Sequence, residues 1–130
     1  MILDTDFVID VMENEPESIK RLHKMILSGQ PQAISAPTLF ELCSGAIRSL
    51  KPEREKERIL STLKGMPILH LDPASAQRAG EIDGTLIKSG CHIQPADSMI
   101  AGIALTTGNA VLTRNIKHFS RVPGLKVETY

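Results

Sequence analysis

The chain has 130 residues, with 15 acidic and 15 basic side chains and a formal net charge of zero. Hydrophobic residues make up 42% of it, enough for a single domain over residues 1–130 that folds without disulfides or a structural metal. The neutral charge disfavours tight nonspecific binding of nucleic acid, and an aromatic content of 3% disfavours a base-stacking platform for single strands.

The sequence has no feature of export or membrane insertion. It opens as Met1-Ile2-Leu3-Asp4, without a basic segment followed by a long apolar run, and no stretch approaches the ~20 apolar residues that cross a bilayer. Cys43 and Cys91 show no CxxC spacing, which favours two reduced thiols. We therefore expect a cytoplasmic protein with no membrane association.

The first half of the chain alternates short apolar runs with amphipathic segments. In chain order we predict a strand at Met1–Leu3, helices at Asp6–Met12 and Pro16–Ser28, a strand at Ala33–Ser35, and helices at Pro37–Leu50 and Pro52–Leu63. Spacings of three and four predict that the second helix buries Ile19, Leu22, His23 and Ile26. The same spacings predict a stripe on the third helix made of Leu39, Cys43, Ala46, Ile47 and Leu50. The charged segment Lys51–Lys64 is expected to be a solvated helix with ion pairs.

The second half continues the alternation. We predict a strand at Ile68–Leu71, helices at Pro73–Lys88 and Pro95–Thr106, and strands at Ala110–Thr113 and Lys126–Glu128. Asp72 is expected to cap the first of these helices, whose buried residues would be Ala79, Ile82, Leu86 and Ile87. Short strands that alternate with helices are typical of an α/β domain with a small, mainly parallel sheet flanked by helices.

Three acids follow the first predicted strand closely. In a parallel sheet, ligands bind beyond the carboxyl ends of the strands, and Asp4 stands directly after Leu3. Asp6 and Asp10 lie nearby, and no Lys or Arg occurs before Lys20 to neutralise them. We favour a functional role for Asp4 over a simple helix cap, and ordinary structural roles for Asp6 and Asp10.

Asp97 is the second informative acid. Apart from His92, it is the only charged residue between Ser89 and Arg114, and it lies on the most apolar helix of the chain. The helix dipole would stabilise an acid near this N-terminus by ~0.3–1 kcal/mol, but a solvated helix end would serve that purpose equally well. We infer a site in which a cation keeps Asp97 ionised.

Glu41 and Asn115 are ambiguous from the residue pattern. Glu41 lies nearly opposite the apolar stripe of its helix, as a solvent-facing residue would, and Asn115 follows a strand and could face the crevice or cap a turn. A site built from carboxylates prefers a hard cation, Mg²⁺ or Mn²⁺, over Zn²⁺. The four histidines show no metal-binding spacing, and His23 is expected to be a core residue.

Four segments in this order resemble the PIN domain family, and within it the VapC-type toxins. They are Met1–Asp6, Ser35–Gly45, Ala96–Ala101 and Leu112–Phe119, followed by a similar Val-Pro-Gly-Leu tail at Val122–Leu125. The resemblance covers nearly the whole chain. It implies a PIN-like fold and an RNA-cleaving activity that depends on Mg²⁺ or Mn²⁺.

The resemblance also implies site residues and partners. Asp4, Glu41 and Asp97 would be the catalytic carboxylates and metal ligands, with Asn115 as a fourth catalytic residue. Many PIN nucleases carry a fourth acid at the position of Asn115, which leaves a second metal open. The resemblance further implies an RNA substrate, a cognate antitoxin protein and a homodimer, as in the toxin of a type II toxin–antitoxin pair.

Two other functions compete with this hypothesis. Leu3–Val8 resembles the Asp-x-Asp opening of a haloacid-dehalogenase-type phosphatase, although the chain is short for that family and Asp97 has no acidic partner beside it. The neutral charge and Asn115 also fit a catalytically weak PIN module that binds RNA or a protein partner.

Overall fold

The computed structural model describes all 130 residues, and its centre is a set of five very short parallel strands. They are β1 (Ile2–Leu3), β2 (Ile34–Ser35), β3 (Ile68–Leu69), β4 (Val111–Leu112) and β5 (Val127–Glu128). One sheet has the order β1-β4-β5 and the other pairs β2 with β3. A parallel bridge between Ile2 and Ala33 connects the two, so that the spatial order is β3-β2-β1-β4-β5. The predicted α/β class with a mainly parallel sheet is confirmed.

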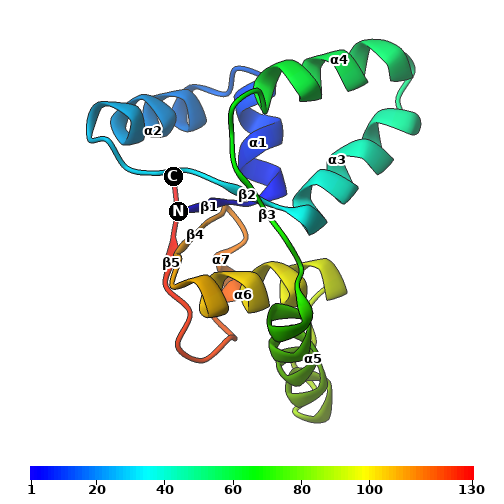
Figure 1. Cartoon of the computed structure of the whole chain (residues 1–130), viewed down its shortest axis with the longest axis vertical. Coiled ribbons are helices and arrows are strands. Elements are labelled where there is room, and N and C mark those ends of the chain that lie inside the picture. The colour runs from blue at the N-terminus through cyan, green and yellow to red at the C-terminus, as the bar shows by residue number, and fades with distance from the viewer.

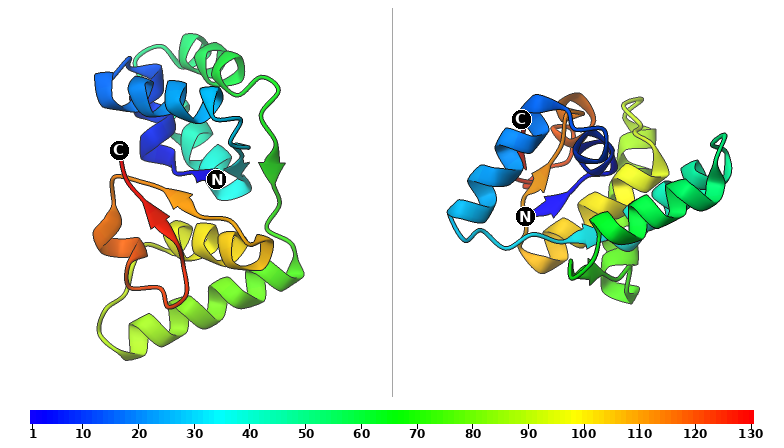
Figure 2. Two further views of the ribbon diagram at one scale, coloured as in Figure 1. Left: turned by 90° about the vertical axis from the view of Figure 1, so that its left-hand side faces the viewer. Right: turned by 90° about the horizontal axis from the view of Figure 1, so that it is seen from above.

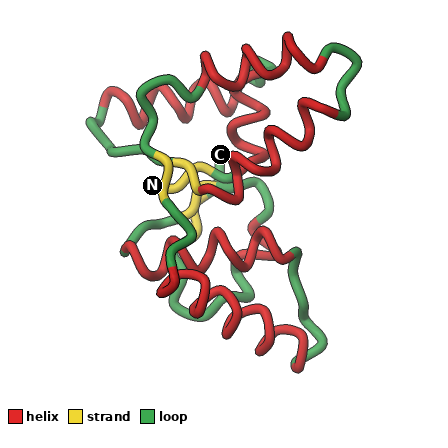
Figure 3. Tube along the Cα trace, turned by 45° about the vertical axis from the view of Figure 1, so that its right-hand side comes forward, coloured by secondary structure: helices red, strands yellow, loops and turns green.

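Helices cover both faces of the strands. One layer holds α1 (Thr5–Met12), α2 (Pro16–Leu27), α3 (Ala36–Ile47) and α4 (Pro52–Thr62). On the other side lie α5 (Pro73–Lys88) and α6 (Pro95–Thr107) (Figures 1 and 2). The strands, yellow in Figure 3, run between these two groups. A short helix that we did not predict, α7 (Ile116–Phe119), follows β4.

Alternation along the strands divides the core into two clusters. Leu3 and Leu112 pack with residues of the α1–α4 layer, whereas Ile2 and Val111 pack with residues of α5 and α6. Successive side chains of a strand point to opposite faces, so β1 and β4 each supply one residue to each cluster. Both faces of these two central strands are therefore buried, as is usual for parallel strands.

The α5–α6 pair packs very closely. Asp72 precedes α5 and caps it as predicted, because its carboxylate accepts a hydrogen bond from the Ser75 backbone amide at 2.8 Å. A Cβ atom added to Gly102 of α6 would lie 2.6 Å from the Ser75 carbonyl oxygen and 2.8 Å from the Ala79 backbone nitrogen. Only glycine permits this approach of α6 to the backbone of α5.

Three predicted buried faces are partly wrong. On α2, His23 is exposed and Ile26 is 59% exposed, so His23 is not a core residue. On α5, Ile87 is 58% exposed. The largest error concerns α3, where Cys43 and Ile47 are exposed and the helix ends before Leu50. Ala46 is buried as predicted, but the other buried residues of α3 are Pro37, Thr38 and Leu42.

The error on α3 has a physical reason. Helical spacing identifies an apolar stripe but does not say whether the protein's own core covers it. The layer of α1 and α4 covers the side of α3 that carries Leu42, and it leaves Ile47 72% exposed. On α4, the expected ion pairs are present: Arg58 contacts Glu55 at 2.7 Å and also donates to the Met12 carbonyl at 2.8 Å.

Two simpler expectations also concern the whole chain. Cys43 and Cys91 form no disulfide. No helix combines the length and the apolar composition that crossing a membrane requires.

Candidate active site

The candidate site lies at the carboxyl edge of the two central strands. Asp4 follows β1 directly and Thr113 follows β4, its hydrogen-bonded neighbour. From β1 the chain proceeds to β2 and β3 on one side, and β4 and β5 lie on the other. This is the point where the strand order reverses, and ligands of open parallel sheets bind there.

Asp4 is fixed by two hydrogen bonds. Its Oδ1 atom accepts from the Thr5 backbone amide at 2.8 Å, and its Oδ2 atom accepts from Thr113 Oγ1 at 2.7 Å. The first bond makes Asp4 the N-cap of α1, so the cap role and the site role coexist in one residue. Asp4 is only 3% exposed, and this burial raises its pKa to about 6, against the opposing effect of the two hydrogen bonds.

Glu41 reaches the same place from α3. Its Oε1 atom accepts a hydrogen bond from Thr5 Oγ1 at 2.6 Å, so Thr5 contacts Asp4 through its backbone and Glu41 through its side chain. Glu41 is half-buried, and burial, followed by the charges of Asp97 and Asp6, raises its pKa. The polar side of α3 therefore faces the start of α1 and not open solvent, which helical spacing alone did not predict.

Asp97 lies in the first turn of α6 and is 9% exposed. Burial raises its pKa, the nearby His118 lowers it, and the charge of Asp6 raises it. The charge of Asp97 in turn raises the pKa of both Asp4 and Glu41. Asp97 is thus close enough to repel both of the other expected site carboxylates, Asp4 and Glu41.

Asn115 is the N-cap residue of α7 and lies beside this group. Its backbone amide donates to Thr113 Oγ1 at 2.9 Å, and its side-chain nitrogen lies 2.7 Å from His118 Nδ1. The same His118 atom is 3.0 Å from Asp97 Oδ2. Asn115 therefore adjoins Asp97 through His118, a residue to which sequence reasoning gave no chemistry. The only signals for His118 were its place in the family-like segment and its spacing from Asn115.

The two remaining acids of α1 differ in their surroundings. Asp6 is exposed, yet its charge raises the pKa of Asp4, Glu41 and Asp97. Asp10 forms an ion pair with Arg114 and accepts a hydrogen bond from Tyr130 at 2.5 Å. Asp10 has a structural partner, as we expected, whereas Asp6 contributes to the negative field of the site.

The donor set fits a hard divalent cation. Its members are oxygen ligands, which Mg²⁺ and Mn²⁺ prefer, and their mutual repulsion would be relieved by a positive charge between them. Glu41 Oε2 and Asp97 Oδ1 accept no hydrogen bond from the protein. The structure has no ready-made arrangement of three or more acidic, histidine or cysteine side chains around one ion position. Metal binding would therefore require the carboxylates to draw together.

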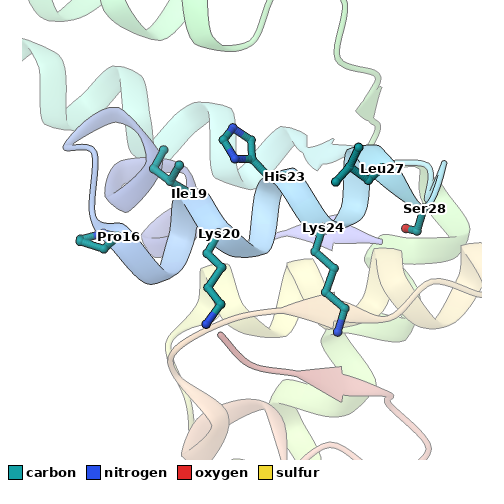
Figure 4. Close-up of a pocket in the computed structure, with 7 residues that line it drawn as sticks. All are labelled: Pro16, Ile19, Lys20, His23, Lys24, Leu27 and Ser28. Carbon is teal, nitrogen blue, oxygen red and sulfur yellow. The ribbon is translucent and has the colours of Figure 1, made fainter.

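Two hollows of the surface lie away from the candidate carboxylates. One runs along α2 and is lined by Ile19, Lys20, His23, Lys24 and Leu27, with Pro16 and Ser28 at its ends (Figure 4). Another, largely apolar, lies between the starts of α3 and α6, next to Glu41 and Asp97 in sequence, and includes Phe40, Ala96 and Met99. Neither contains a candidate carboxylate, so the site is defined by its chemistry and not by a deep cavity.

Comparison with known proteins places the chain in a family. The model of the PIN domain matches residues 1–125, and the chain belongs to this family. The tRNA(fMet)-specific endonuclease VapC of Salmonella typhimurium is 35% identical over 129 residues, covering 99% of this chain and 96% of that protein. Ribonuclease VapC2 of Haemophilus influenzae is 33% identical over the same shares. Within the PIN family the chain is a ribonuclease of the VapC toxin type, from the VapBC toxin–antitoxin systems.

Solved structures agree with this assignment. VapBC2 from Rickettsia felis, bound to a DNA fragment from its promoter, contains a chain that superposes with a TM-score of 0.89 at 26% identity, covering 99% of this chain and 97% of that one. DNA-bound VapBC from Salmonella typhimurium gives a TM-score of 0.88 at 35% identity, covering 98% and 96%. The predicted PIN-like fold and toxin class are confirmed, and the phosphatase alternative is wrong.

Proposed function

We propose that this VapC-type ribonuclease hydrolyses RNA phosphodiester bonds with Mg²⁺ or Mn²⁺ held by Asp4, Asp97 and Glu41. The observation that carries the proposal is the convergence of three partly buried carboxylates, with Asp97 repelling the other two, at the point where the strand order reverses. Asp4 and Asp97 are the main ligands, and Glu41 binds directly or through water. When bound, the cation activates water and stabilises the charge that develops on the phosphoryl oxygens.

The protein's own groups prepare this arrangement. Thr113 uses its hydroxyl to donate to Asp4 while it accepts from the Asn115 backbone, so it orients the Asp4 carboxylate. Thr5 restrains Asp4 and Glu41 together. Asn115, whose amide can donate and accept, is the candidate for orienting the attacking water or a metal-bound group.

The substrate class follows from the relatives. Two curated relatives at 35% identity are named tRNA(fMet)-specific endonucleases, so a structured tRNA, and the initiator tRNA first, is the substrate we propose. The net charge of zero indicates that few phosphates are neutralised by the protein surface, which suits a transient encounter with a folded RNA more than extended binding. The cytoplasm is where this enzyme would meet such a substrate.

We also propose two protein partners. The matched solved structures include VapBC and FitAB complexes, and a cognate antitoxin would complement the acidic site by inserting an Arg or Lys. A homodimer is supported by exposed apolar side chains in and after α3, namely Phe40 at 72%, Ile47 at 72% and Leu50 at 102%. Such a concentration of exposed apolar area is typical of an interaction surface.

The test is cleavage of initiator tRNA and of other structured RNAs by purified protein with Mg²⁺, with Mn²⁺ and with chelator. Wild type is compared with Asp97→Asn and, as a matched control, with Glu81→Gln, a surface carboxylate that pairs only with Arg78. We expect metal-dependent cutting by wild type and by Glu81→Gln, with a loss of at least about 100-fold in Asp97→Asn, the scale of removing a group that stabilises the transition state.

Two other outcomes are informative. Equal cutting by wild type and Asp97→Asn would show that the site is misassigned or that a contaminant cuts. Absence of cutting together with absence of Mn²⁺ binding in calorimetry would favour the catalytically weak binding module, which the net charge and Asn115 also fit.

A further inference from the structure

His118 is held in a fixed position beside Asp97. It is the third residue of α7, and the next residue, Phe119, is fully buried in the cluster of the α5–α6 side. The backbone amides of His118 and Phe119 both bond to the Asn115 carbonyl, which closes this short turn of helix. The imidazole is 32% exposed, so one of its sides reaches solvent while Nδ1 points to Asp97 Oδ2 at 3.0 Å.

The orientation of the Asp97 carboxylate depends on its one contact with His118, whereas the Asp4 carboxylate is fixed by two hydrogen bonds. Asp4 accepts two hydrogen bonds, one of them from the backbone. The contact with His118 is the sole polar contact between the Asp97 carboxylate and another side chain, and no backbone amide bonds to it. A carboxylate in this state can rotate about its side-chain torsions unless His118 restrains it.

With Asp97 ionised, as a metal ligand must be, the hydrogen-bond chemistry of Nδ1 allows one satisfactory arrangement. Nδ1 faces both the Asp97 oxygen and the Asn115 amide, and a ring nitrogen either carries a hydrogen or accepts one. If Nδ1 only accepted, its lone pair would face the Asp97 oxygen with no hydrogen between them. If Nδ1 carries the hydrogen, it donates to Asp97, and a half-turn of the Asn115 amide presents its oxygen to the same hydrogen.

We propose that His118 is a positioning residue of the site: its Nδ1–H donates to Asp97 Oδ2 and leaves Oδ1 of Asp97 free to bind a cation. The inference rests on the proposed role of Asp97 as a metal ligand. Groups that hydrogen-bond to metal ligands orient them, and their loss typically lowers metal affinity about 10- to 100-fold. Asn115 completes the group by contacting the same ring nitrogen, Nδ1.

The experiment measures Mn²⁺ binding by calorimetry on full-length variants of His118. His118→Leu removes the hydrogen bond, and His118→Gln moves its amide nitrogen to the place of Nε2. His118→Asn keeps an N–H donor near the position of Nδ1. We expect Leu and Gln to weaken Mn²⁺ binding about 10-fold or more, and Asn to stay within about threefold of wild type. His23→Leu, a substitution of an exposed histidine on α2, is the matched control and should bind as wild type does.

Two further readouts separate positioning from mere packing. The melting temperature without metal should change little among the His118 variants, since the ring is one-third exposed. In RNA cleavage at saturating Mn²⁺, most of the activity of His118→Leu should return. NMR of the ring nitrogens should show the hydrogen on Nδ1 in wild type, and this preference should weaken in Asp97→Asn.

Each alternative outcome overturns a defined statement. Wild-type Mn²⁺ affinity in all His118 variants would overturn the positioning role and leave the proposed metal site standing. Equal weakening in Leu and Asn would show that the ring acts by its shape and not by its N–H. If the wild-type protein itself binds no Mn²⁺, both the metal site and the role of His118 fail.

Discussion

The α5–α6 pair and the α3–α4 arm both bring an acid to the site, but they are built very differently. In α6, seven residues are buried, and the backbones of α5 and α6 approach each other at Gly102. In α3, four residues are buried, and Phe40 and Ile47 on the same helix face solvent. Asp97 is therefore placed by close packing of a whole helix, whereas Glu41 depends on its hydrogen bond to Thr5.

The largest effect should come from breaking the close packing. Gly102→Val would place side-chain atoms within 2.6–2.8 Å of α5 backbone atoms, which cannot move independently of their helix. We expect a loss of roughly 4 kcal/mol in the free energy of unfolding, above the usual cost of overpacking. Urea unfolding measures it. A loss below about 1 kcal/mol would show that α6 can shift, and that Asp97 is not placed as rigidly as we argue.

The pH dependence of stability should reveal the cost of burying ionised carboxylates at the sheet edge between the two layers. The pKa of Asp4 is about 6 in the folded protein, above the value of about 3.9 in an unfolded chain. Between these values the folded state binds more protons, so the free energy of unfolding should fall as pH rises from about 4 to 6, by roughly 3 kcal/mol from Asp4 alone. The raised pKa values of Glu41 and Asp97 act in the same direction.

Urea unfolding at a series of pH values, with and without Mn²⁺, tests this prediction. Asp4→Asn should flatten the profile, because Asp4 contributes the largest resolved shift among the site acids. Mn²⁺ should also flatten it, since a cation bound to the ionised form offsets the repulsion. A profile that is flat for wild type without metal would contradict the burial of an ionisable Asp4.

On α3, a buried and an exposed apolar residue can be compared directly. Leu42 is 4% exposed and Ile47 is 72% exposed. We expect Leu42→Ala to cost about 2–3 kcal/mol, toward the low end for a buried leucine because the thin arm can partly collapse around the gap. Ile47→Ala should change the stability of the monomer by less than about 0.5 kcal/mol. Comparable losses in both variants at low protein concentration would mean that the apolar stripe predicted from sequence is buried after all.

These contrasts explain which features the sequence could predict. Asp4 was recognisable because an acid that follows a buried strand must lie at the sheet edge, whatever the rest of the fold. Asp97 was recognisable because it is an acid on an almost wholly apolar helix. Glu41 was not, because the orientation of α3 depends on α1 and α4, and only the family resemblance identified it.

Other features depend on contacts that no local pattern contains. His118 and Asp97 are 21 residues apart in sequence, and they meet because α7, which carries His118, packs against α6. The close approach at Gly102 is similar, since a glycine inside a helical pattern reads only as a weak helix former. The strands and most helix limits were predictable from apolar runs, prolines and glycines, whereas α7 was too short for its period to be visible.

The smallest predicted effect concerns Gly84 of α5, which has open space around it, whereas Gly102 is in close contact with the backbone of α5. Gly84 lies in the interior of α5, is exposed, and would place an added Cβ in open space. Gly84→Ala should therefore stabilise the protein by about 0.5–1 kcal/mol, since alanine loses less backbone entropy in a helix and meets no neighbour. Gly90, at φ +69° just after the same helix, is the matched control, and Gly90→Ala should destabilise by about 1 kcal/mol. Urea unfolding measures both changes in stability.

If Gly84→Ala destabilised the protein as Gly102→Val is expected to do, the surface of α5 opposite α6 would also be packed against something. Our statement that only one face of this helix is closely packed would then be wrong.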